Sequence, residues 1–161
     1  MDASDGEAAM SDTVAFAFFA RFLAPPAPAP PTQSTQNGAA LFSSTGCALC
    51  HTPSLTTGAA SSAALSNQTV RLYSDLLVHR MGQGLADQIV QGAADADEFR
   101  TAPLWGVGQR VFFLHDGRTS DLLQAIRAHA SSGSEANSSI TLFNSLPAAQ
   151  QQAILNFLRS L

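Results

Sequence analysis

A pair of cysteines three residues apart, followed at once by a histidine, constrains the fold of this chain more than any other feature. The motif is Cys47-Ala48-Leu49-Cys50-His51, and it contains the only two cysteines among the 161 residues. This pattern is typical of c-type haem attachment, in which each thiol adds to one haem vinyl group and the histidine becomes the proximal iron ligand. The sequence therefore predicts a fold built around one covalent haem c, held by Cys47, Cys50 and His51.

Two other kinds of site also use a Cys-x-x-Cys pair. A redox dithiol of the thioredoxin type needs a βαβ context, whereas the residues flanking this motif are rich in glycine and alanine, with no strand before them. A structural zinc site needs about four ligands. The remaining histidines, His79, His115 and His129, are scattered and form no second pair. Haem c is therefore the favoured interpretation, with a dithiol and zinc as the alternatives.

The composition limits the partners of the chain. Hydrophobic residues make up 45% of the sequence, which is enough for the core of one domain, and charged residues make up only 12%. All eight basic residues are arginines and the net charge is −4. We expect no nucleic-acid partner, because no basic stripe is available to meet phosphates. A redox partner protein fits better, in the form of a second haem domain or a neighbouring subunit.

The sequence divides into an N-terminal segment, residues 1–36, which includes a proline-rich stretch, and a c-type haem domain, residues 37–161. The segment has an acidic start, a Phe-rich helix expected over residues 12–24, and a stiff polyproline-like spacer over residues 25–31 followed by polar coil. Its phenylalanines need a surface to pack on, in this domain or in a partner. The apolar run over residues 14–23 is too short to span a bilayer, so no transmembrane segment is expected. Haem c attachment implies a periplasmic or otherwise extracytoplasmic location.

Helical periodicity without sustained alternation predicts an all-α, cytochrome c-like haem domain with an N-terminal helical arm and long loops. One helix starts near Ala39 and runs toward the haem motif, and a short helix is expected over residues 85–90. Another helix covers residues 121–129, and the last begins near residues 145–147. Residues 131–139 have the composition of a flexible loop. We expect the first and last helices of the domain to cross beside the haem.

Several side chains are chemically suited to be the sixth iron ligand, since thioether sulfur and imidazole both bind haem iron. The candidates are Met10, Met81, His79, His115 and His129. Met10 lies outside the predicted haem domain. Met81 sits in a glycine-bounded turn and His129 ends an amphipathic helix, and their spacing from the motif does not decide between them. The plainer interpretation of His79 and His115 is a hydrogen-bonded loop histidine.

Four spaced blocks of the sequence resemble one bacterial family. They are the haem motif with the residues around it, residues 72–87, residues 98–108, and residues 113–118 followed by Ala125-Ile126 and His129. Together they look like the C-terminal haem domain of the di-haem oxidoreductases, also called thiol oxidoreductase-like. That family is related to the di-haem cytochrome c peroxidases and to the methylamine-utilisation di-haem enzyme. The resemblance covers roughly residues 12–161.

The resemblance has implications for the iron site. Members of the superfamily have one electron-transferring and one peroxidatic haem domain, and in the related peroxidases the C-terminal domain holds the electron-transferring haem. The sixth ligand of that haem corresponds to His129, so the resemblance implies ligation by His51 and His129, with Met81 as the alternative. The chain departs from the family pattern at Arg80, where Asp is usual, and in the longer stretch of residues 130–135 after the ligand histidine.

Two functions fit these observations. The favoured one is a mono-haem c-type cytochrome that transfers electrons as a domain or subunit of a larger redox assembly. The alternative is a peroxidase-type di-haem oxidoreductase, or its C-terminal fragment, acting on peroxide or an organic substrate; this chemistry needs an open iron position and a nearby acid or base. The acidic residues 1–11 are the reverse of a signal-peptide n-region, and only the second haem domain of the family is recognised. We therefore expect the second half of a longer polypeptide.

Overall fold

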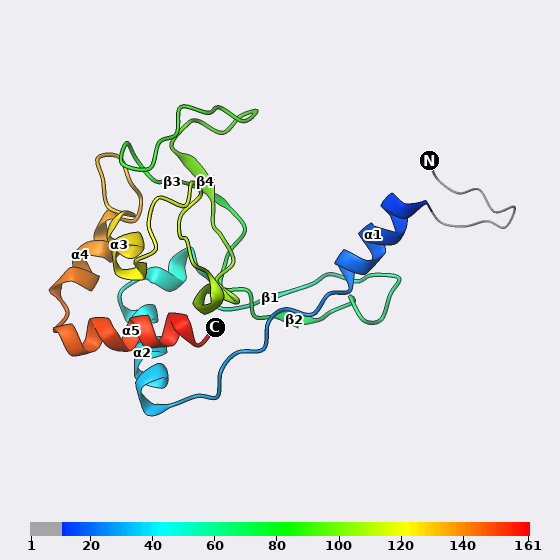
Figure 1. Ribbon diagram of the computed structural model, residues 1–161, viewed down its shortest axis with the longest axis horizontal. Coiled ribbons are helices and arrows are strands. Elements are labelled where there is room, and N and C mark those ends of the chain that lie inside the picture. The colour runs from blue at the N-terminus through cyan, green and yellow to red at the C-terminus, as the bar shows by residue number, and fades with distance from the viewer. Residues whose placement is uncertain (1–10) are drawn as a thin grey trace, which may run out of the picture.

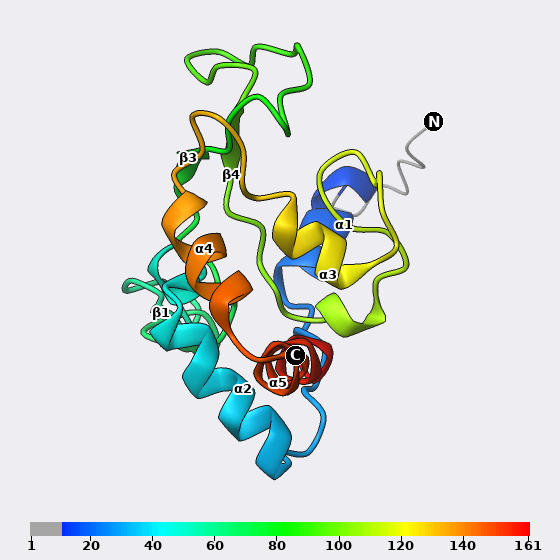
Figure 2. The same ribbon diagram turned by 90° about the vertical axis from the view of Figure 1, so that its left-hand side faces the viewer.

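Two helices from opposite ends of the main-body sequence cross each other. The computed structural model describes residues 11–161, and in it α2 (Gln33–Ser44) packs across α5 (Ala148–Arg159) (Figures 1 and 2). At the crossing, a Cβ on Gly38 would clash with the carbonyl oxygen of Ala153, so only glycine allows this approach. The predicted crossing is confirmed. The helix starts earlier than expected, and residues 33–36 are its first turn rather than coil, because Thr32 caps it.

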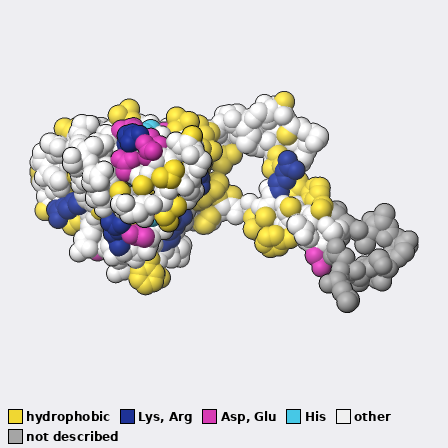
Figure 3. All heavy atoms as spheres, turned by 90° about the horizontal axis from the view of Figure 1, so that it is seen from above, with side chains coloured by type: hydrophobic (Ala, Val, Ile, Leu, Met, Phe, Trp, Pro, Cys, Tyr) yellow, Lys and Arg dark blue, Asp and Glu magenta, His cyan; other side chains and the backbone are white. Residues whose placement is uncertain are grey.

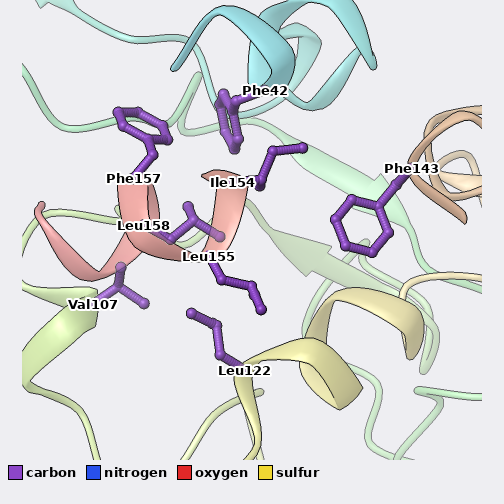
Figure 4. Close-up of a cluster of buried hydrophobic side chains, with 8 residues drawn as sticks. All are labelled: Phe42, Val107, Leu122, Phe143, Ile154, Leu155, Phe157 and Leu158. Carbon is purple, nitrogen blue, oxygen red and sulfur yellow. The ribbon is translucent and has the colours of Figure 1, made fainter. Parts of the chain in front are cut away.

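The hydrophobic core lies along α5 and is closed by single side chains from the surrounding elements (Figure 4). Its buried members are Phe42, Val107, Leu122, Phe143, Ile154, Leu155, Phe157 and Leu158. The ring of Phe42 packs edge-on against Phe157, with 5.4 Å between ring centroids. The last helix therefore carries the apolar stripe that its periodicity predicts.

Two shorter helices each contribute one buried side chain to this core. Helix α3 (Leu122–Arg127) confirms the helix predicted near this position, and the carboxylate of Asp121 caps it by accepting from the Leu123 amide at 2.8 Å. Helix α4 (Asn137–Ser145) begins inside residues 131–139, so the predicted loop is wrong from residue 137 onward. Tertiary burial of one face of α4 overrides the weak helix propensity of its serines.

The all-α fold class is wrong, because the structure also contains two small antiparallel sheets. Strand β1 (Leu55–Thr56) pairs with β2 (Thr69–Val70), and β3 (Val78–Arg80) pairs with β4 (Glu98–Arg100). Strands of two or three residues are too short to show the alternation by which a strand is recognised in sequence. The fold is therefore mixed, although helices and loops dominate it.

The helix expected over residues 85–90 is also absent. These residues form turns and bends instead. Gln88 adopts a left-handed backbone conformation, with φ of 66°, which no interior residue of a right-handed helix can take. The segment belongs to a long excursion between β3 and β4.

The N-terminal arm consists of α1 (Asp12–Arg21) and the proline-rich linker after it. The predicted helix is confirmed as far as residue 21, but α1 projects away from the main body and none of its residues is buried (Figures 1 and 3). Phe16, for example, is 70% exposed. The linker, in contrast, lies on the main body, where the Ala29 amide donates to the Ser160 carbonyl oxygen at 2.8 Å. The predicted candidate Met10 lies outside the described residues.

None of the helices within residues 11–161 is both long enough and apolar enough to cross a membrane.

The division into residues 1–36 and residues 37–161 stays a prediction.

Candidate haem-binding cavity

One cavity of about 530 Å³ brings together the residues that the sequence analysis selected within the described part of the chain. Its walls come from the Cys-x-x-Cys-His segment, from β3 and β4, from the loop after β4, and from α3, α4 and α5. The candidate site residues among its lining are Cys47, Cys50, His51, His79, Met81, His115 and His129. Most of the remaining lining is apolar, which is typical of a cavity that takes a flat organic cofactor.

The two thiols lie in a tight turn at one edge of this cavity. Gly46 has φ of 84°, and this left-handed residue starts the 3₁₀ turn of Cys47–Leu49. The amide of His51 then donates to the Cys47 carbonyl oxygen at 3.0 Å. Neither cysteine is in a disulfide, and burial raises the pKa of both thiols. The turn therefore brings two protonated thiols and one imidazole into the lining of the same cavity.

The imidazole of His51 is fixed by one backbone hydrogen bond. Its Nδ1 lies 3.0 Å from the carbonyl oxygen of Tyr73. Because a carbonyl only accepts, Nδ1 carries the hydrogen and Nε2 keeps its lone pair. Burial lowers the pKa of His51 to about 4, against the opposing effect of this hydrogen bond. A neutral imidazole with its other nitrogen held by a carbonyl is the usual state of a histidine that binds a metal.

His129 has the same arrangement, although it comes from a different part of the chain. It follows α3, and its Nδ1 donates to the Ala125 carbonyl oxygen at 2.8 Å. Burial lowers the pKa of His129 as well. The hydroxyl of Ser134 holds the residue's backbone by donating to its carbonyl oxygen. His129 therefore also offers a free Nε2 within the cavity.

His79 is held by carboxylates on both sides. Its Nδ1 lies 2.8 Å from Glu135 Oε2 and its Nε2 lies 2.9 Å from Asp75 Oδ2. The hydrogen bond with Glu135 raises the pKa of His79 against the effect of burial, and Asp75 raises it further. Both ring nitrogens act as donors, so this imidazole has no lone pair for iron. Neither partner is predicted from the sequence, and Glu135, 56 residues from His79, gives no local signal.

Met81 and His115 line the cavity without comparable orientation. The backbone of Met81 is fixed, since its amide donates to the Asp97 carbonyl oxygen at 2.7 Å, but no contact fixes its thioether. The ring of His115 stacks on Phe99 with 4.3 Å between centroids, and its Nε2 lies 3.6 Å from the Asp87 carboxylate. The distal candidates with an uncommitted donor atom and a fixed backbone are therefore His129 and Met81.

The residues present fit a haem. Two thiols, two neutral imidazoles and an apolar wall surround one cavity, and Cys47, Cys50 and His51 are the residues that would attach and ligate it. No curated protein and no solved structure matches the chain. The family described as "Di-haem oxidoreductase, putative peroxidase" matches residues 1–161. The match confirms the resemblance seen in the four sequence blocks, and the chain belongs to the di-haem oxidoreductase family.

Proposed function

We propose that this chain binds one covalent haem c and transfers electrons through it, with His51 and His129 as axial ligands. Family membership supports a redox function in general. One observation carries the finer proposal. The imidazoles of His51 and His129 line the same cavity, and each gives its Nδ1 hydrogen to a backbone carbonyl, which leaves Nε2 available to iron.

The residues around the cavity have separate roles in this proposal. The thiols of Cys47 and Cys50 would hold the haem covalently, as thioethers to its two vinyl groups. A bound haem supplies an iron that gains and loses one electron. The carbonyls of Tyr73 and Ala125 hold the two imidazoles in place, and apolar side chains such as Phe42 exclude water. With both His51 and His129 as ligands, the iron would have no position open to peroxide, which would suit electron transfer better than peroxide chemistry.

The proposed partner is a redox protein, in the form of a second haem domain or a neighbouring subunit. The exposed phenylalanines of α1 support an assembly, because no residue within 11–161 buries this apolar helix face. Since haem c is attached outside the cytoplasm, we propose a periplasmic or otherwise extracytoplasmic location.

A peroxidase-type oxidoreductase is the second candidate, and one feature of the cavity favours it. His79, with its carboxylate partners Asp75 and Glu135, lines the same space as the two neutral histidines. Such a group supplies the proton transfers that peroxide cleavage requires. This function needs an open iron position, so the state of the sixth ligand separates the two candidates.

The test has an attachment step and a ligand step. Haem that stays with the protein through acid–acetone extraction supports the thioethers, and release of free haem contradicts them. We then expect a low-spin absorption spectrum that cyanide does not change. His129→Ala should convert the iron toward high spin and allow cyanide to bind.

Met81→Leu and the matched control His115→Ala should leave the spectrum low spin. If Met81→Leu opens the iron and His129→Ala does not, the ligand assignment is wrong. A high-spin unmutated protein that reacts with peroxide would favour the peroxidase.

A further inference from the structure

Two arginines line the cavity without a carboxylate partner. Of the eight arginines in the chain, only Arg100 and Arg110 are part of the lining. Neither forms an ion pair with any of residues 11–161, whereas Arg80 and Arg118 are paired with carboxylates. Both cavity arginines are exposed, which places them at the mouth of the cavity rather than at its floor.

The backbone holds both arginines in place while their side chains stay uncommitted. Arg100 ends β4 opposite Val78, and the next amide, of Thr101, donates to the Leu77 carbonyl oxygen at 2.9 Å. Arg110 follows the 3₁₀ turn of Val107–Gln109, and its amide donates to the Val107 carbonyl oxygen at 3.2 Å. The backbones of Arg100 and Arg110 are therefore fixed beside the cavity, while neither guanidinium group forms a hydrogen bond or ion pair within residues 11–161.

A haem carries two propionate carboxylates, and this apolar cavity has few groups to receive them. A carboxylate near apolar surface is destabilised unless it is paired, and a guanidinium pairs with it through two parallel hydrogen bonds. The other cation in the lining, His79, already has Asp75 and Glu135. We propose that Arg100 and Arg110 bind the two haem propionates and raise the reduction potential of the iron. This inference rests on the haem site proposed above.

The effect on the potential follows from charge. A positive guanidinium near the haem disfavours the oxidised iron, which carries one more positive charge than the reduced iron. Replacing either arginine by neutral glutamine should lower the potential. At a fixed solution potential we expect the ratio of oxidised to reduced protein to rise about three- to tenfold for each arginine, given partial screening at the rim. A tenfold change corresponds to 59 mV for one electron.

The experiment is a redox titration of holoprotein at constant pH and salt. The variants are Arg100→Gln, Arg110→Gln, the pair together, and Arg71→Gln as the matched control. Arg71 is exposed and lies outside the cavity lining, so its loss changes the net charge equally. We expect both cavity variants to have lower potentials than the control, the pair to be lowest, and Arg100→Lys or Arg110→Lys to restore most of the loss.

The outcomes separate this inference from the function on which it rests. Covalent haem with a low-spin spectrum in every variant, together with lowered potentials, supports the inference. The same spectra with potentials equal to that of Arg71→Gln overturn the propionate assignment and leave the haem site intact. An unmutated protein without covalent haem overturns both.

Discussion

Replacing His79 by leucine should destabilise the protein, and by more in mildly acidic than in alkaline solution. The substitution removes the hydrogen bonds with Glu135 at 2.8 Å and with Asp75 at 2.9 Å. A hydrogen bond to a desolvated charged group contributes about 1.5–3 kcal/mol, and an exposed ion pair about 0.2–1 kcal/mol. The Asp75 side chain is 13% exposed and that of Glu135 is 51% exposed. His79→Leu should therefore cost about 2–4 kcal/mol at pH 6.

The direction of the pH dependence follows from the pKa of each group. The pKa of His79 is raised by folding, chiefly through its hydrogen bond with Glu135. Its contribution to stability is complete below the unfolded-state pKa of about 6.5 and is lost as the pH rises through the folded-state value. Burial acts to raise the pKa of Asp75, but the hydrogen bond from His79 holds it below its ordinary value.

Glu135 behaves in the same way as Asp75. The Arg80 amide and then His79 lower the pKa of Glu135. The contributions of both carboxylates are present above their unfolded-state pKa values of about 4 and are lost as the pH falls through the folded-state values. The cluster should therefore stabilise the fold most between about pH 4.5 and 6.5.

Urea unfolding of the unmutated protein and His79→Leu at pH 6 and pH 9 measures this effect. We expect a smaller difference in unfolding free energy at pH 9, because the contribution of the charged imidazole decreases as the pH rises above its unfolded-state pKa. His115→Leu is the matched control, since it removes another histidine of the cavity. His115→Leu should lower the free energy of unfolding by less than His79→Leu at pH 6, because the Nε2 of His115 is 3.6 Å from the Asp87 carboxylate, beyond hydrogen-bond distance. An equal or larger cost of His79→Leu at pH 9 would refute a charged His79.

Three further predictions concern the fold. Gly38→Ala should lower the free energy of unfolding by about 3 kcal/mol or more, because its Cβ meets backbone of α5; Gly58→Ala, which meets nothing within 4 Å, is the control, and equal urea midpoints would contradict the crossing. Phe143→Ala should cost about 3–5 kcal/mol in the same assay, since its side chain is fully buried. Serine at Phe16 and Phe19 should leave the melting temperature unchanged, and a fall of several degrees by circular dichroism would mean that α1 packs on the main body.

The parts of the fold that sequence predicts are those with a local cause. The crossing helices have apolar stripes or caps within one or two turns, and Cys47, Cys50 and His51 form one contiguous motif. The strands were missed because pairing such as that of His79 with Phe99 joins residues 20 apart over a length too short for a pattern. The prediction of a helix over residues 85–90 is wrong because Gln88 has a left-handed backbone conformation, which a glutamine in the sequence does not indicate.

The candidate site shows the same limit at the level of single side chains. His51 follows from its motif, but the environment of each remaining histidine depends on distant residues. His129 is held by Ala125 within its own helical turn, so the contact that orients it has a local cause. His79 is held by Glu135, which lies 56 residues away in the sequence, and no residue near His79 in the sequence indicates that contact.

The two departures from the family pattern lie against each other in the structure. The amide of Arg80 donates to Glu135 Oε1 at 2.9 Å, and the Glu135 amide donates back to the Arg80 carbonyl oxygen at 2.9 Å. The Arg80 guanidinium is meanwhile drawn away by Asp95, Asp97 and Glu98, which leaves the Glu135 carboxylate to His79. The altered position 80 and the longer stretch of residues 130–135 therefore form one unit. That unit commits His79 to two carboxylates, and it leaves His129 and Met81 as the two candidates for the sixth ligand of the proposed haem.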